Sequence, residues 1–273
     1  MKVSLEDEFE DVVNKAHTGL HADGEFPSLD TSDLMQSLCD QISEGQAPEE
    51  EIRKLAQALH LKQDALVALA RQPEIEQLSL PDHLHTIVMP FGPYTVNVQV
   101  LIHRKSHQCL IFDAGTGAEE ILTYLETSRL TPHSLLVTHG HRDHIAGIGR
   151  IKRAYPRIRI YAHSRTLYPG AIAANEGDAI TFEDFTIRVY ETFGHSQDSV
   201  SYLIQDHSTN TQAMIPGDTI FARSIGNIHS NYKASLDTIR TKILSQKPDT
   251  ILLPGHGPAT TVADELEYNP FFP

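Results

Sequence analysis

A short histidine-rich segment constrains this 273-residue chain more than any other feature of its sequence. Positions 138–144 read THGHRDH, follow directly after a short apolar run typical of a buried strand, and precede a helical pattern. One strand-to-helix loop therefore carries His139, His141, Asp143 and His144. Imidazole nitrogens and carboxylate oxygens are ligands of zinc and, in other ratios, of iron or manganese. The segment predicts a metal site at the end of a buried strand.

Three further ligand-type residues share this structural context. His195, Asp218 and His256 each follow an expected strand and come directly after a glycine, in the segments FGH, PGD and PGH. Glycine permits a sharp turn and a close backbone approach at such positions. Four strand ends are therefore expected to bring seven ligand-type side chains together in one metal centre.

The pattern of the chain after residue 84 predicts an α/β fold. Expected strands lie at 86–89, 96–103, 109–113, 134–138, 159–162, 179–182, 186–191, 200–205, 212–215 and 250–253. Expected helices lie at 118–127, 145–154 and 234–245. Long runs of strands with few helices between them favour two packed sheets flanked by helices over a doubly wound sheet.

The first quarter of the chain differs from the rest in the periodicity of its apolar residues and in its charge. Residues 1–72 have loose helical periodicity and predict a small helical domain, followed by a linker at 73–83 and a domain with the metal motif at 84–273. Residues 1–85 hold 18 acidic and 6 basic residues, whereas the remaining 188 are nearly balanced. Residues 49–70 weakly resemble a phage-repressor helix-turn-helix, but this charge opposes phosphate contacts. We therefore expect no nucleic-acid partner.

Other features of the sequence indicate the location of the protein in the cell. No apolar run approaches the ~18 residues of a membrane span, and the first ten residues are acidic, unlike a signal peptide. Two cysteines are too few for a disulfide framework. A cytoplasmic location without membrane contact and a small-molecule substrate are expected. For the helical segment, the expected role is structural: it packs on the second domain, caps its pocket or forms a homodimer contact.

With these seven ligand-type residues, the sequence resembles those of the metallo-β-lactamase superfamily, and within it those of the glyoxalase II-like hydrolases. The resemblance spans about 84–273 and includes the DAG turn at 113–115, PGDTIF at 216–221, PGHGP at 254–258 and NPF at 269–271. It implies an αββα sandwich.

The resemblance also implies a function. One metal would be held by His139, His141 and His195, and the other by Asp143, His144 and His256, with Asp218 as the bridge. The cofactors would be two divalent ions, with zinc expected and iron or manganese as alternatives. A metal-bridging hydroxide would cleave a thioester or a related activated ester, with Asp143 and Asp218 as the catalytic carboxylates.

Several positions depart from the family pattern and leave the substrate open. The 17 residues after His256 contain no Lys or Arg, so glutathione recognition of the glyoxalase II kind is not expected. Asp218 argues against β-lactamase activity, and Phe221 stands where lactonases of the family have a tyrosine. A mononuclear iron persulfide dioxygenase, a lactonase and a ligand-sensing regulator remain alternatives. Three further residues are candidates for the substrate pocket: His163, Arg223 and His229.

Overall fold

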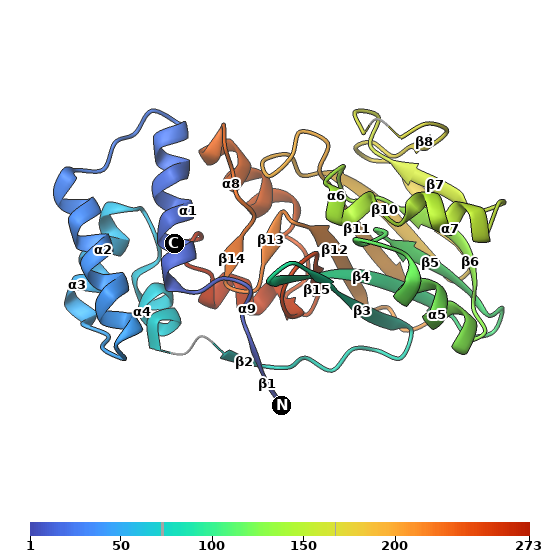
Figure 1. The fold of residues 1–273 in the computed structure, drawn as a ribbon, viewed down its shortest axis with the longest axis horizontal. Helices are drawn as coiled ribbons and strands as arrows, with labels where there is room; N and C mark the ends of the chain where they lie inside the picture. The colour runs from blue at the N-terminus through green and yellow to red at the C-terminus, as the bar shows by residue number, and fades with distance from the viewer. Residues whose placement is uncertain (72–73, 167) are drawn as a thin grey trace.

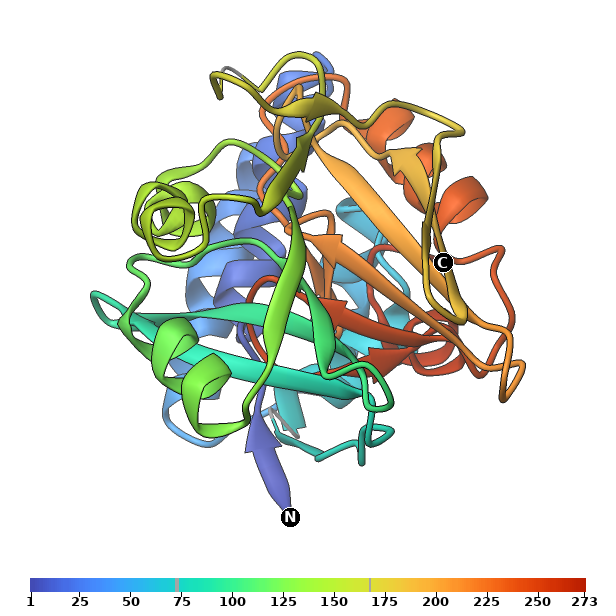
Figure 2. The ribbon, with the colours of Figure 1, turned by 90° about the vertical axis from the view of Figure 1, so that its right-hand side faces the viewer.

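Two six-stranded sheets face each other in the part of the chain that follows residue 83 (Figures 1 and 2). The structure is a computed structural model that describes residues 1–71, 74–166 and 168–273, with only the backbone described at 29 and 30. The first sheet has the order β3 (Leu84–Phe91), β4 (Tyr94–His103), β5 (Gln108–Phe112), β6 (Thr131–Leu136), β7 (Arg159–Ala162) and β8 (Ile172–Ala173). The second has the order β16 (Thr260–Thr261), β15 (Ile251–Pro254), β12 (Gln212–Gly217), β11 (Val200–Asp206), β10 (Phe185–Glu191) and β9 (Ala179–Phe182).

Helices cover the outer face of each sheet, which completes four layers (Figure 2). α5 (Glu119–Thr127) and α7 (Ile148–Ala154) share an apolar cluster with the first sheet, and the short α6 (Arg142–Ile145) lies beside them. α8 (Tyr232–Lys242) and α9 (Val262–Tyr268) share another cluster with the second sheet. This arrangement confirms the expected α/β class and the αββα sandwich.

Strand β11 shows why both faces of the sheets are apolar. Val200, Tyr202 and Ile204 lie in the cluster between the two sheets, whereas Leu203 belongs to the cluster under the outer helices. Successive side chains of a strand point to opposite faces, so a central strand buried on both sides needs apolar residues at consecutive positions.

The N-terminal segment is helical, with one difference from expectation. Residues 1–71, the part of the segment that the structure describes, contain four helices: α1 (Phe9–Ala22), α2 (Leu29–Ser43), α3 (Glu49–Ala58) and α4 (Gln63–Arg71). Before them, however, β1 (Lys2–Ser4) pairs antiparallel with β2 (Glu74–Glu76), which lies in the expected linker. The predicted boundary between residues 72 and 73 lies outside the described residues.

The N-terminal helices share their core with the rest of the chain. Phe9, Val12 and Leu20 of α1 lie in one apolar cluster with Tyr232 and Leu236 of α8. Figure 1 shows α1 between the other N-terminal helices and the sandwich. The helices therefore stabilise the outer layer of the second sheet instead of enclosing a separate core.

Two further details differ from the expected elements. The helix expected at 145–154 is divided into α6 and α7, and Gly147 at the break packs against the carbonyl oxygens of Ala114 and Gly117. α9 and the hairpin of β13 (Ile220–Phe221) and β14 (Ser224–Ile225) were not expected. No helix within the described ranges is long and apolar enough to cross a membrane.

Candidate metal centre

The seven ligand-type residues lie at the ends of four strands and converge on one edge of the sandwich. The loop after β6 carries His139 and His141, and α6 then presents Asp143 and His144. His195 follows β10, Asp218 follows β12, and His256 follows β15. Strand ends at one sheet edge lie close together, so residues far apart in sequence can meet there.

Three imidazoles form the first group. The Nε2 atoms of His139 and His195 each lie 3.0 Å from Nδ1 of His141. These three nitrogens all lie within 4.8 Å of one another. Donor atoms around a tetrahedral zinc, each bound at ~2.0–2.1 Å, are separated by roughly 3.4 Å. The spacing of the three nitrogens therefore fits a single divalent ion.

Asp143, His144 and His256 form the second group. Oδ2 of Asp143 lies 3.3 Å from Nε2 of His256 and 3.6 Å from Nε2 of His144. All three residues are buried. A carboxylate and two imidazole nitrogens at these distances are again a donor set for a divalent ion.

Asp218 lies between the two groups. Its Oδ2 is 3.5 Å from Nε2 of His195 on one side and 3.3 Å from Nε2 of His256 on the other. Its Oδ1 and Nε2 of His144 are buried without a hydrogen-bond partner within the described parts of the chain. Such buried polar atoms are costly unless something binds them. A divalent cation would satisfy both atoms, so the residues present fit the metal that the sequence predicts.

Polar groups behind the ligands fix the orientation of their rings. Oδ2 of Asp113 lies 2.8 Å from Nδ1 of His144 and accepts a hydrogen bond from the hydroxyl of Thr138. The backbone oxygen of Thr95 lies 2.5 Å from Nδ1 of His256, and that of Asn227 lies 3.2 Å from Nδ1 of His195. When Nδ1 of a histidine donates to such a group, its Nε2 is left free to bind a metal.

The electrostatics of the centre keep its carboxylates ionised. Burial opposes charge on Asp218, but His144 and the hydrogen bond from His256 hold its pKa well below the usual range. Burial also opposes protonation of His256, yet hydrogen bonds to Asp143 and Asp218 raise its pKa to about 10. Burial lowers the pKa of His139. Ligands must be deprotonated to bind a cation, so metal binding would displace the proton on His256.

Gly255 makes room for this arrangement. A Cβ atom at this position would lie 2.2 Å from Oδ1 of Asp218 and 2.8 Å from Cε1 of His144. Any other residue would push these side chains apart, which explains why glycine precedes His256.

A cavity of about 380 Å³ opens onto the centre. Asp143, His195, Asp218 and His256 form its floor, and Phe221 lies beside them. The N-terminal segment contributes a wall, in line with one of the roles expected for it, although the sequence did not indicate which of its residues do so: Glu6, Asp7, Asp11, Asn14, Lys15 and Thr18. No local pattern marks these residues, because only tertiary packing brings α1 to the pocket.

The three residues proposed from sequence for the substrate pocket lie outside this lining. His163 is buried, with Nε2 3.1 Å from Oε1 of Glu191. The guanidinium of Arg223 lies 5.2 Å from the ring centre of Tyr268, because the β13–β14 turn reverses the chain and directs Arg223 towards α9. His229 is exposed.

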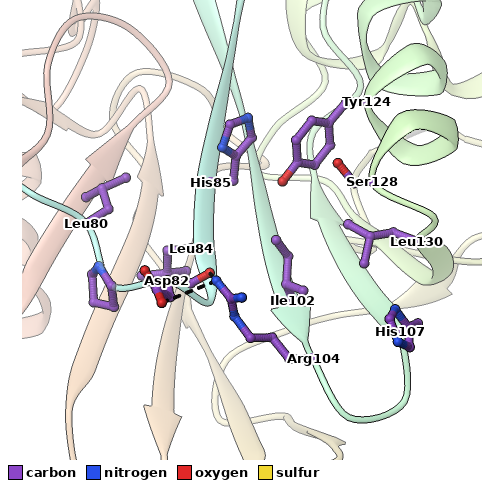
Figure 3. Close-up of a pocket in the computed structure, with 11 residues that line it drawn as sticks. Leu80, Asp82, Leu84, His85, Ile102, Arg104, His107, Tyr124, Ser128 and Leu130 are labelled. Carbon is purple, nitrogen blue, oxygen red and sulfur yellow. Dashed lines mark hydrogen bonds and ion pairs between the residues drawn. The ribbon is translucent and has the colours of Figure 1, made fainter.

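A second cavity, of about 600 Å³, is lined by residues of β3, β4 and α5 and of the loops beside them (Figure 3). Its wall includes the stacked rings of His85 and Tyr124, and the ion pair between Arg104 and Asp82 lies at its edge (Figure 3). None of the seven ligand-type residues lines this cavity.

Comparison with known proteins agrees with this geometry. The family model of the metallo-β-lactamase superfamily matches residues 92–256, a segment that contains all seven ligand-type residues. The chain belongs to this superfamily. One relative of the chain is the probable metallo-hydrolase YqgX of Bacillus subtilis (strain 168). It is 33% identical over 207 residues, which cover 67% of this chain and 95% of YqgX.

Two more proteins resemble this chain over different shares of their lengths. A hydroxyacylglutathione hydrolase of Pectobacterium atrosepticum is 27% identical over 157 residues, which cover 57% of this chain and 60% of that protein. The crystal structure of BLEG-1 B3 metallo-β-lactamase is 31% identical, with a TM-score of 0.58, and the match covers 68% of this chain and 99% of that one. The chain is therefore a metal-dependent hydrolase of this superfamily, and its His and Asp clusters have the donor atoms that a divalent metal requires.

Proposed function

We propose that the chain is a dinuclear, glyoxalase II-like hydrolase that cleaves a thioester or a related activated ester. One observation carries the proposal: Asp218 lies between two three-residue donor groups, with Oδ2 3.5 Å from His195 and 3.3 Å from His256. A carboxylate in that place can bind two ions. A mononuclear dioxygenase would need only one of the two donor groups for its single ion.

The bound ions, which we expect to be zinc, would supply Lewis acidity and lower the pKa of a water molecule towards ~7. Asp143, which lines the cavity, would accept a hydrogen bond from the attacking water and orient it towards the ester carbonyl. The buried ring of Phe221, centred 5.8 Å from that of His256, excludes bulk water from this side.

The class of leaving group follows from acid–base chemistry. A thiol has a pKa of ~8.5 and departs as a thiolate without a proton donor. Thioester cleavage therefore needs no dedicated general acid on this chain. Phe221 also lacks the hydroxyl that a tyrosine would place in the pocket, which does not favour a lactonase. The resemblance to a hydroxyacylglutathione hydrolase supports the same substrate class.

A substrate panel on the metal-loaded protein tests the proposal. The panel contains hydroxyacyl thioesters of glutathione and of N-acetylcysteamine, a lactone, a β-lactam and glutathione persulfide. We expect metal-dependent thiol release from the thioesters. Oxygen consumption with the persulfide and no thiol release from the thioesters would instead assign a dioxygenase, and turnover of the lactone or β-lactam alone would assign those classes.

A further inference from the structure

The pocket above the metal centre has two unlike walls. One is the tip of the β3–β4 hairpin, where the large side chains of Phe91 and Tyr94 are exposed. The other is the N-terminal segment, which supplies six of the lining residues. This segment lies outside the 92–256 region that the family model matches. The family match therefore does not extend to the second wall.

Lys15 fixes this wall in place. Its Nζ lies 2.5 Å from Oδ2 of Asp7 and 2.8 Å from the backbone oxygen of Ile225, and both charged side chains are only 10% exposed. Ile225 lies two residues before Asn227, whose backbone oxygen contacts His195. The ammonium of Lys15 thus neutralises Asp7 and ties α1 to a loop of the metal centre.

Glu6 has a long ion pair with His256 in this arrangement but no hydrogen bond to it. Its side chain is 17% exposed, and its Oε1 lies 3.9 Å from Nδ1 of His256, beyond hydrogen-bond distance. That nitrogen already has the backbone oxygen of Thr95 as its partner. None of the side chains and backbone groups that the structure describes donates a hydrogen bond to the Glu6 carboxylate.

The position of Glu6 depends on a specific contact with the metal loop. Gly257 has φ of +70°, and a Cβ atom there would lie 2.8 Å from Cβ of Glu6. The glycine after His256 therefore lets the N-terminal backbone approach this loop. The wall as a whole carries three carboxylates (Glu6, Asp7 and Asp11) against the one ammonium of Lys15.

We infer that Glu6 is a specificity-determining residue that selects thioesters whose acyl group carries an ammonium. This inference rests on the proposed thioester hydrolysis. A partly desolvated carboxylate that receives no hydrogen bond gains most from a cationic donor, because charge-assisted hydrogen bonds are the strong ones. An acyl group with a negative charge would meet repulsion instead, and specificity commonly uses both effects. The methylenes of the acyl chain would pack against Phe91 and Tyr94.

The experiment compares three N-acetylcysteamine thioesters of similar size on the metal-loaded full-length enzyme. The 3-aminopropionyl ester is cationic, the butanoyl ester is its neutral isostere, and the malonyl ester is anionic. We expect kcat/KM to be about tenfold or more higher for the cationic ester than for the neutral one, as one hydrogen bond to a charged group predicts. The anionic ester should be the poorest substrate.

Glu6→Gln keeps the size of the side chain and removes its charge, so the cationic-to-neutral ratio should fall towards one. The matched control is Glu10→Gln, an equal charge change at an exposed position of α1 outside the pocket, which should keep the wild-type ratio. A wild-type ratio near one, or an unchanged ratio in Glu6→Gln, would overturn this inference while thioester hydrolysis stands. Absence of thiol release from all three esters would overturn the proposed function and this inference with it.

Discussion

Asp113 holds His144 from outside the metal centre, with Oδ2 2.8 Å from Nδ1 of the imidazole. The other carboxylate oxygen accepts a hydrogen bond from the backbone N–H of Thr138 at 2.7 Å. One buried carboxylate therefore joins the histidine-rich loop to the second ligand group. It directs Nε2 of His144 towards Asp218, 3.4 Å away.

Asp113→Asn should weaken metal binding. The amide is isosteric with the carboxylate but accepts a weaker hydrogen bond from Nδ1, and changes of this kind typically lower metal affinity by about 10- to 100-fold. Competition with a chromophoric chelator measures the affinity. Asp206→Asn is the control, since Asp206 is also buried but bonds Ser208 and Thr209 after β11. Equal affinities of Asp113→Asn and wild type would contradict this role.

Because of Glu265, the free energy of unfolding should decrease as pH rises. Burial raises its pKa to about 7 from the ordinary 4.5, although hydrogen bonds from Asn269 and Thr260 act in the opposite direction. The folded state thus holds a proton that the unfolded chain releases above pH 4.5. The stabilisation is complete below that pH and is lost as pH approaches 7, by up to roughly 3 kcal/mol.

Thermal unfolding of Glu265→Gln across pH 5 to 8 checks this sign. The amide cannot ionise, so the melting temperature of the variant should improve relative to wild type as pH increases. A difference that is constant with pH would show that Glu265 titrates normally.

Leu20→Ala should destabilise the whole chain and not the N-terminal helices alone. Leu20 is 2% exposed in the cluster that α1 shares with α8. Removing a buried leucine side chain typically costs about 2–5 kcal/mol. Calorimetry should show one transition at a lower temperature. A separate transition of the N-terminal helices, with the remainder unaffected, would mean that they form an independent unit.

The convergence of the seven ligand-type residues could be predicted from the sequence because its signals are local. The segment at 138–144 and the glycine before each of His195, Asp218 and His256 lie at strand ends that apolar periodicity indicates. The division of α6 from α7 was not visible, because it depends on Gly147 packing against the carbonyl of Ala114 from a separate loop.

The wall of the pocket could not be predicted, since it depends on contacts between distant parts of the chain. Lys15 reaches the backbone oxygen of Ile225 across 210 positions, and Gly19 packs against the ring of Tyr232. In the same way, β1 pairs with β2 although residues 5–73 lie between them in the sequence. Charge and periodicity within residues 1–72 carry no information about such partners.

The number of divalent ions bound per chain tests most directly whether the seven residues form one dinuclear centre. Elemental analysis after dialysis against zinc should give about two ions per chain for the wild type. Asp218→Ala, which removes the carboxylate between the two donor groups, should bind fewer ions and lose most activity. One ion per chain at full occupancy, or none, in the wild-type protein would contradict the dinuclear assignment.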